Sequence, residues 1–273
     1  MKLTGVGRRY GRRRPWVLRG VALELPPGAL VRIEGGNGGG KSTLLRILAG
    51  VDTPTEGRVA GRPHRTAYVP ERFPAALPLT AGSYLTHLGR VHGLTGAEAA
   101  RRAAAGLERF GAAAYARTPL SELSKGTSQK VAVAQALLAG PGLLVLDEAW
   151  TGLDAPARAE LDRAVTERTA AGGTVVFVDH DPARLAGRPD AHHRIEAAAL
   201  VPVPVPGGAA RPPSVRIHAA GPPGAVPPPG LAATPAPGGG VVLTVDADRS
   251  DAVLRELLTA RPPWHIRAVE ELR

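Results

Sequence analysis

The stretch Gly35–Ser42, GGNGGGKS, lies between an apolar strand pattern, LVRIEG (30–35), and an apolar helical pattern, KSTLLRILAG (41–50). It matches G-x-x-x-x-G-K-[ST], in which glycines let backbone N–H groups approach the phosphates of a nucleotide. Lys41 would bring a mobile positive charge to the β- and γ-phosphates, and Ser42 a hydroxyl group to Mg²⁺. A glycine-rich loop without function is the alternative, and the Lys-Ser pair in a strand–loop–helix context argues against it. This phosphate loop therefore predicts a nucleotide-binding α/β domain.

A second stretch, LLVLDE (143–148), carries the acidic groups that such a site needs. Its continuous apolar run predicts a strand that is buried on both faces of a parallel sheet. Asp147, at the end of the strand, can hold the Mg²⁺ shell, and Glu148 can polarise a water molecule opposite the γ-phosphate. The alternative is an ordinary strand end with two solvated acids, which would be the better interpretation if the phosphate loop were absent.

His180 ends another buried strand pattern, VVFVDH (175–180). Ligands of open α/β sheets bind at the carboxyl ends of the strands, and a histidine there can hydrogen-bond to a γ-phosphate. A single histidine at a strand end is usually structural, so this assignment depends on the two motifs above.

The chain up to about residue 199 alternates between strand and helix patterns. Two short strands are expected at GRVAG (57–61) and TAYVPE (66–71). Another strand is expected at HHRIEAA (192–198), after the buried strand pattern that ends at His180. Residues 79–140 are helical in pattern and rich in Ala and Leu, and a further helix begins near Asp154. Such alternation predicts a layered α/β fold.

The composition changes after Ala199. Residues 201–240 are dominated by Pro, Gly and Ala and predict a linker, with SVRIHA (214–219) as one short strand within it. Residues 241–273 predict a strand, a helix and a strand, which form a small accessory unit that is too small to be stable alone. The expected domains are therefore 1–200, 201–240 and 241–273.

The overall composition limits the function classes. The 273 residues include no cysteine, so disulfides and thiol chemistry are excluded. No apolar run reaches the length of a membrane-spanning helix, and the N-terminal stretch lacks the apolar segment of a signal peptide, so we expect a cytoplasmic protein. The net charge of +10 comes with abundant Arg, Ala, Gly and Pro, so nucleic-acid binding is not expected from charge alone.

A second phosphate-facing element is predicted in SELSKGTSQKVAVAQALLAG (121–140). A Ser/Gly turn here leads into a helix, where free backbone N–H groups and the helix dipole favour an anion. One chain would then contain two separate elements for binding phosphate.

Together these motifs resemble those of the ATP-binding subunit of ABC transporters. The ordered set is Tyr10, GGNGGGKST (35–43), YVPERF (68–73), LSKGT (123–127), LLVLDEAWTGLD (143–154) and VDH (178–180), and the resemblance covers about residues 1–199. It implies an α/β P-loop NTPase core of the ABC ATPase type, with an antiparallel β subdomain and a helical subdomain at about 79–140. The Pro/Gly-rich linker and the small α/β unit follow this core.

The resemblance also implies the roles of individual residues. Tyr10 would stack on adenine, GLD (152–154) would be the D-loop, and His180 the switch histidine. Two subunits would pack head to tail, so that Ser124 and Gly126 of one touch the γ-phosphate held by the other. The residues expected to bind ATP are Tyr10, Gly35, Gly36, Asn37, Gly38, Gly39, Gly40, Lys41, Ser42, Thr43, Glu71, Ser124, Gly126 and Asp154. Catalysis is expected from Glu148, His180 and Lys41, and Mg²⁺ binding from Ser42, Asp147 and Glu71.

Three positions depart from the usual pattern of that family. Glu71 stands where glutamine is usual, and an ionised carboxylate only accepts hydrogen bonds and adds negative charge near the phosphates. Lys125 and Thr127 replace Gly and Gln in the signature, where the lysine could help to hold phosphate. Ala149 and Trp150 replace a Pro-Thr pair, and we expect Trp150 to pack locally without a further role.

Three functions are considered. The favoured one is a homodimeric ATPase subunit that binds a separate integral membrane permease at the inner face of the membrane, with export favoured over import. A second is an ATPase that acts on nucleic acid or the ribosome; such proteins usually carry two cassettes or a long inserted coiled coil, and only the basic charge supports it here. A third is a regulatory nucleotide-binding module with little turnover, which Glu148 argues against and Glu71 leaves open.

Overall fold

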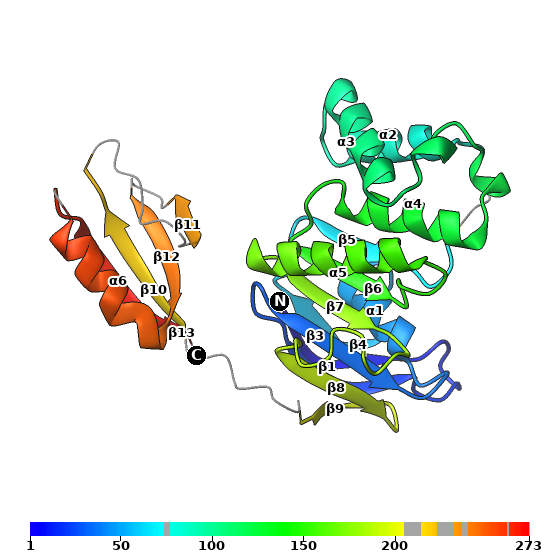
Figure 1. Ribbon diagram of the computed structural model, residues 1–273. Helices are drawn as coiled ribbons and strands as arrows, with labels where there is room; N and C mark the ends of the chain where they lie inside the picture. The colour runs from blue at the N-terminus through cyan, green and yellow to red at the C-terminus, as the bar shows by residue number, and fades with distance from the viewer. Residues whose placement is uncertain (74–76, 205–213, 223–231, 236–239, 261, 273) are drawn as a thin grey trace. The chain divides into compact units, whose positions relative to one another are not determined.

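A computed structural model describes residues 1–73, 77–204, 214–222, 232–235, 240–260 and 262–272 (Figure 1). The described chain divides into two compact units, Met1–Pro206 and Gly207–Arg273. Within the described residues, the first unit contains a six-stranded sheet with the order β5-β6-β7-β3-β8-β9. The strands of this sheet are β3 (Leu30–Gly35), β5 (Thr66–Val69), β6 (Leu143–Asp147), β7 (Thr174–Val178), β8 (Ala191–Glu196) and β9 (Ala199–Val203). All neighbours pair in parallel except β8 and β9.

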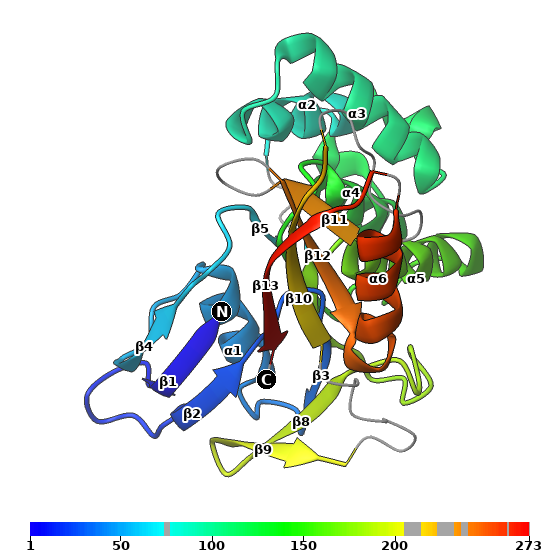
Figure 2. The ribbon, with the colours of Figure 1, turned by 90° about the vertical axis from the view of Figure 1, so that its left-hand side faces the viewer.

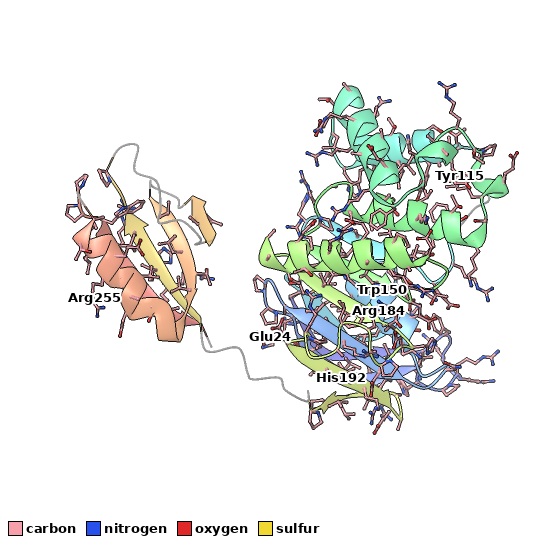
Figure 3. The ribbon with its side chains drawn as sticks, in the orientation of Figure 1. Glu24, Tyr115, Trp150, Arg184, His192 and Arg255 are labelled. Carbon is pink, nitrogen blue, oxygen red and sulfur yellow. The ribbon has the colours of Figure 1, made fainter. Side chains whose placement is uncertain are left out.

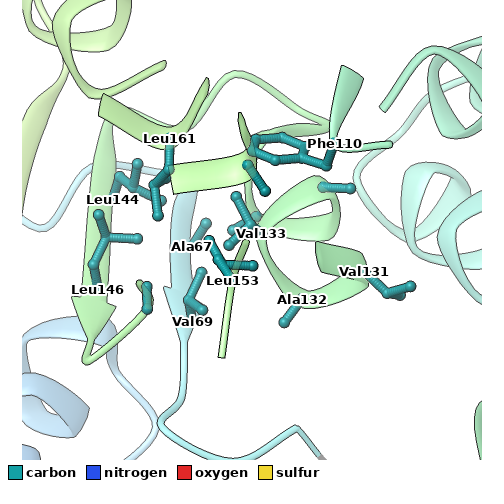
Figure 4. Close-up of a cluster of buried hydrophobic side chains, with 14 of the residues drawn as sticks. Ala67, Val69, Phe110, Val131, Ala132, Val133, Leu144, Leu146, Leu153 and Leu161 are labelled. Atoms are coloured by element: carbon teal, nitrogen blue, oxygen red, sulfur yellow. The ribbon is translucent and has the colours of Figure 1, made fainter. Parts of the chain in front are cut away.

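Strand β6 is apolar from Leu143 to Leu146 because each of its faces enters a different core. Leu144 and Leu146 of β6 enter a cluster with helices α4 (Lys125–Leu137) and α5 (Ala155–Ala170) (Figure 4). Leu143 and Val145 enter a second cluster on the opposite face, with helix α1 (Lys41–Ala49). Since side chains alternate along a strand, a run without polar residues is what a doubly covered strand requires. The predicted strands at LVRIEG, LLVLDE and VVFVDH are confirmed as β3, β6 and β7.

An antiparallel sheet lies beyond α1. In the described part of the chain it has three strands in the order β2-β1-β4, namely β1 (Lys2–Arg8), β2 (Leu18–Glu24) and β4 (Glu56–Ala60) (Figure 2). Leu3, Val6 and Val21 of this sheet share the α1 core. Helix α1 ends at Gly50, whose φ of 79° is left-handed, as expected for a glycine that ends a helix.

Helices α2 (Ala81–Val91), α3 (Gly96–Arg109) and α4 form the helical part of this unit, together with single turns at Ala113–Tyr115 and Leu120–Glu122. Thr80 and Thr95 cap α2 and α3 by accepting hydrogen bonds from backbone N–H groups. Asp154 caps α5 by accepting from the N–H of Ala157 at 3.0 Å, and the helix begins near Asp154, as the sequence predicted. The helical pattern expected for residues 79–140 is thus confirmed.

The second unit corrects the predicted boundaries of the C-terminal region. Among its described residues is a four-stranded antiparallel sheet of order β11-β12-β10-β13, packed on helix α6 (Ala247–Thr259). Its strands are β10 (Ser214–Ala220), β11 (Ala232–Pro235), β12 (Val241–Asp246) and β13 (His265–Leu272). The predicted short strand SVRIHA is β10, and it lies in the interior of this sheet between β12 and β13.

The predicted linker at 201–240 therefore contributes to folded structure at both ends. Strand β9 continues the first unit's sheet past residue 200, and β10 and β11 belong to the second unit. The reason is the alternation in β10, where Val215, Ile217 and Ala219 are buried with α6. The Pro/Gly-rich surroundings hid this short pattern. Residues 205–213, 223–231 and 236–239 of the predicted linker lie outside the described residues.

Two adjacent leucines of α6 give a test of this core. Leu257 is fully buried, whereas the side chain of Leu258 is 55% exposed. Replacing Leu257 with Ala is expected to lower the free energy of unfolding of the second unit by about 2–5 kcal/mol, because it removes buried methyl groups and leaves a cavity. The buried Trp264 reports this unfolding by its fluorescence during urea titration. Leu258→Ala is the matched control, and equal effects of the two substitutions would contradict the assigned core.

Candidate nucleotide-binding site

The phosphate loop connects the end of β3 to the start of α1. Gly38 and Gly40 have φ angles of 73° and 101°, which favour glycine, and a Cβ on Gly40 would lie 2.8 Å from the carbonyl oxygen of Val17. The Nζ atom of Lys41 donates to the carbonyl oxygens of Gly35 at 2.9 Å and Gly36 at 3.1 Å. These acceptors are uncharged, so they hold the ammonium group in place without neutralising its charge.

A cleft of about 500 Å³ opens over this loop. It brings together most of the residues that the sequence predicted for nucleotide binding. Its lining comprises Tyr10, Val17, Asn37, Gly38, Gly39, Gly40, Lys41, Ser42, Thr43, Glu71, Glu148 and His180. Gly35 and Gly36 line a neighbouring hollow, which shares Lys41 and His180 with the cleft. Four predicted residues, Asp147, Ser124, Gly126 and Asp154, are not among those that line the cleft.

Glu148 and His180 form a pair at the wall of the cleft. The Nε2 atom of His180 lies 2.7 Å from Oε1 of Glu148, and the side chains are 59% and 15% exposed, respectively. Glu148 has a left-handed φ of 53°, and its backbone N–H donates to the carbonyl oxygen of Val178 at 3.0 Å. A non-glycine residue in this conformation is uncommon because the conformation costs energy. Strained residues of this kind cluster at functional sites. The backbone thus turns at the end of β6 and directs the carboxylate to the cleft.

Asp147 lies one residue earlier and is buried. Its Oδ2 atom accepts a hydrogen bond from the hydroxyl group of Tyr68 at 2.9 Å. Burial and the nearby Asp147 carboxylate raise the pKa of the Tyr68 phenol far above its ordinary value, so the hydroxyl keeps its proton and continues to donate. Tyr68 was quoted in a sequence motif but was given no role, and it orients the carboxylate that the sequence assigned to Mg²⁺.

Tyr10 is held by two residues that the sequence analysis missed. Its hydroxyl group donates to Asp52 at 3.1 Å and lies 3.2 Å from the hydroxyl of Thr43. The guanidinium group of Arg8 lies 4.6 Å from the centre of the Tyr10 ring and pairs with Asp52 at 2.7 Å. One face of the ring therefore contacts a cation, and the ring is half exposed. No sequence signal would have joined Asp52 to Arg8 and Tyr10, because it lies 44 and 42 residues after them in the chain.

The second turn that the sequence predicted to face phosphate begins α4. Ser124 is the N-cap and accepts from the N–H of Thr127 at 3.1 Å, as expected for a serine at this position. Ser124 and Lys125 are exposed, so they are available to a group outside this chain's own cleft.

The first turns of α4 are also joined to the segment after Glu148. A Cβ on Gly126 would lie 2.7 Å from the carbonyl oxygen of Gly152. The side chain of Gln129 donates to the carbonyl oxygen of Ala149 at 3.2 Å. Lys130 pairs with Asp154 at 2.6 Å, so the Asp154 carboxylate is engaged by this lysine as well as by the helix cap. The Lys130 contact and the cap hydrogen bond lower the pKa of Asp154.

A phosphate loop and a Glu–His pair facing one cleft, on a parallel sheet of this order, define a P-loop nucleotide hydrolase. The family model described as "ABC transporter" matches residues 18–151. The zinc import ATP-binding protein ZnuC of Cereibacter sphaeroides is 42% identical over 174 residues, which are 62% of this chain and 69% of that protein. The macrolide export ATP-binding/permease protein MacB of Chromobacterium violaceum is 34% identical over 201 residues, 67% of this chain and 31% of that protein.

The solved structures agree with the sequence relatives. A dimeric, post-hydrolysis structure of the ATP-binding cassette MJ0796 with ADP and Pi has a TM-score of 0.66 and 26% identity, and it covers 76% of this chain and 99% of that one. A structure described as the ATP-binding subunit of an ABC transporter has a TM-score of 0.67. The chain belongs to the family of ABC transporter ATP-binding proteins, and it is an ATPase of that family. The resemblance and the fold class predicted from the sequence are thereby confirmed.

In the parts of the chain that the structure describes, no helix combines the length and the apolar character that crossing a bilayer requires. Within the same residues, no group of three or more His, Cys, Asp or Glu side chains is gathered to hold a metal ion. Mg²⁺ in nucleotide sites is usually held by one or two side chains together with phosphate oxygens and water, so a larger cluster is not required here.

Proposed function

We propose that this chain is the ATP-hydrolysing subunit of an ABC transporter and that two copies close head to tail around ATP to drive a separate membrane permease. One observation carries this proposal. The phosphate-loop cleft and the exposed turn at Ser124 are both suited to phosphate, but that turn is not part of the cleft wall. A two-fold dimer would join each cleft to the turn of the other copy and complete two sites at once.

The roles of the site residues follow from their positions. Lys41 and the loop N–H groups would bind the phosphates, and Tyr10 would stack on adenine through the ring face opposite Arg8. Ser42 and Asp147, with Glu71 at the edge of the cleft, would hold Mg²⁺, which supplies positive charge to the phosphate oxygens when it is bound. Glu148 would accept a proton from the attacking water, and His180 would hydrogen-bond to the γ-phosphate.

The direction of transport is a finer proposal. We infer export from the C-terminal unit that follows the cassette, and we place the subunit at the inner face of the membrane through its permease. Of the relatives reported above, one is named for import and one for export. The direction therefore stays a prediction.

The function is tested by capture from native membranes. A tagged Glu148→Gln variant, incubated with solubilised membranes, is expected to retain a multi-span membrane protein more strongly with Mg-ATP than without nucleotide. The Lys41→Ala variant, which should not bind ATP, is the matched control. Retention of ribosomes or RNA, with ATPase activity that RNA stimulates, would favour the nucleic-acid alternative and overturn the transporter proposal.

Glu71 gives a further test of the site. Its exposed carboxylate lines the cleft and adds negative charge near the bound phosphates. Glu71→Gln is expected to raise kcat for ATP hydrolysis by about two- to tenfold, because it removes that charge and restores a hydrogen-bond donor. Steady-state ATPase rates measure the effect, with the exposed Glu24→Gln on β2 as control. Equal rates for wild type and Glu71→Gln would contradict the inference that the Glu71 charge slows hydrolysis.

A further inference from the structure

Arg32 is a buried arginine in β3, the strand that ends in the phosphate loop, and only 7% of the residue is exposed. Its two terminal nitrogens donate to backbone carbonyl oxygens of a single loop, residues 179–184, which we call the His180 loop. The acceptors are the carbonyl oxygens of Asp179 (3.3 Å), Asp181 (3.0 Å), Pro182 (3.2 Å) and Arg184 (3.1 Å). A buried charge is costly unless hydrogen bonds compensate it, and this loop supplies them.

The Arg32 hydrogen bonds connect the two strands that lead into the phosphate loop and the His180 loop. Strand β3 leads into the phosphate loop, and its parallel neighbour β7 leads into the His180 loop. Arg32 is paired in register with Phe177, and its guanidinium group lies 5.7 Å from the centre of that ring. Arg32 therefore joins the loop that contains His180 to the strand that leads into the phosphate loop.

The His180 loop has a second set of contacts through Arg184, which Figure 3 labels beside Trp150. Arg184 lies 5.4 Å from the centre of the Trp150 ring and 3.3 Å from a carboxylate oxygen of Asp162. The Trp150 indole N–H donates to the other Asp162 oxygen at 2.8 Å. These contacts join the loop to the segment after Glu148. Trp150 packs locally, as expected, but its partners belong to the same loop that Arg32 holds from inside.

The alternative is that Arg32 only stabilises the fold. The Nε atom of Arg32 is buried and has no hydrogen-bond partner among the described residues. The cost of burying the guanidinium group is therefore only partly offset by its hydrogen bonds. Its neighbours Val31 and Ile33 are buried apolar residues. An apolar residue at this position would avoid the uncompensated atom, but it would remove all four hydrogen bonds to the loop carbonyls. The Asp181 carbonyl would still accept from the N–H of Arg184 at 3.1 Å. All four hydrogen bonds of the Arg32 guanidinium hold the backbone of the His180 loop, which favours a role in positioning that loop.

We propose that Arg32 is a positioning residue for ATP hydrolysis: through the backbone of the His180 loop it keeps His180 beside Glu148 at the wall of the phosphate cleft. The inference rests on the proposed role of His180. Arg32 is not among the residues that line the nucleotide cleft, but it lines the neighbouring hollow together with Lys41 and His180. Its loss is therefore expected to lower turnover much more than ATP affinity.

A double-mutant cycle in the full-length chain tests this. Arg32→Gln is expected to lower kcat by about 10- to 100-fold, since small displacements of catalytic groups have effects of this size, while KM for ATP stays within about twofold. In a His180→Ala background the same substitution is expected to change kcat by less than about twofold, because the group that it positions is absent. Arg32→Lys, which keeps the charge and some of the donors, is expected to restore part of the lost rate.

Arg62→Gln is the matched control. The Arg62 guanidinium also donates to backbone carbonyls, those of Leu48 at 3.0 Å and Ile47 at 2.9 Å, but at the far end of α1. It is expected to lower the melting temperature without a loss of kcat. Multiplicative losses from Arg32→Gln and His180→Ala would overturn the inference, and so would failure of both Arg32 variants to fold. A His180→Ala variant with the wild-type rate would instead overturn the proposed role of His180 itself.

Discussion

Glu148→Gln is expected to lower kcat for ATP hydrolysis by about a hundredfold to ten-thousandfold while ATP binding is retained. Glutamine has the shape of glutamate and can occupy the same left-handed backbone position, but it cannot accept a proton from water. The cleft and the Lys41 contacts would remain unchanged. The variant should therefore hold ATP without consuming it, and two copies should remain closed around it. Turnover is measured with purified protein, and the dimer by solution scattering with Mg-ATP.

The control for this substitution is Glu108→Gln, a change of the same chemistry on the exposed face of α3. It is expected to leave both turnover and oligomeric state as in the wild type. A Glu148→Gln protein that stays monomeric at saturating Mg-ATP would refute the shared site. A wild-type rate of turnover in this variant would show that a group other than Glu148 is the catalytic base.

Gly126→Ala is expected to have the second-largest effect, with a loss of kcat of about tenfold or more and little change in ATP affinity. The added Cβ would lie 2.7 Å from the carbonyl oxygen of Gly152, and a backbone atom moves only if its whole segment moves. The substitution would thus displace the first turn of α4 from the Gly152 segment. The phosphate loop of the same chain is separate from this contact, so nucleotide binding, measured by equilibrium titration, should persist.

Gly96→Ala provides the comparison. Gly96 is the first residue of α3, and an added Cβ would meet no atom of the described residues within 4 Å. Alanine also favours the helical conformation, so this variant should fold as well as the wild type and keep its activity. If Gly126→Ala retained normal ATP-dependent dimerisation and turnover, the turn at Ser124 would not be the element that completes the partner's site.

The sequence predicted those features that short-range patterns determine. The apolar run 143–146 marked a strand with two buried faces, and Asp154 marked the start of α5, because each feature depends on the local chain. Residues that line the cleft could be named from motifs, since the phosphate loop and the strand ends meet by topology. The strand β10 was only partly foreseen, because its few alternating residues lie among Pro/Gly-rich segments and its partners lie later in the chain.

The remaining features depend on contacts between distant segments. The Arg32 side chain reaches a loop that begins 147 residues later in the chain. Asp52 contacts Tyr10 and Arg8, which precede it by 42 and 44 residues. From the sequence alone, an arginine within an apolar strand pattern has no visible hydrogen-bond partner, because its acceptors lie in a distant segment. The conformation of Glu148 likewise could not be derived, since glutamate has no intrinsic preference for it.

The left-handed backbone at Glu148 also bears on how this position evolves. Glycine would adopt the same φ of 53° without a steric penalty, so the fold alone would be better served by a residue with no side chain. If Glu148 is the catalytic base proposed above, the strained backbone is the energetic cost of keeping a carboxylate at the cleft wall. In a duplicated gene copy released from that demand, drift towards glycine at this codon would relieve strain and silence the enzyme in one step. The proposed role of Glu148 therefore predicts that copies with glycine at this position bind ATP but do not hydrolyse it.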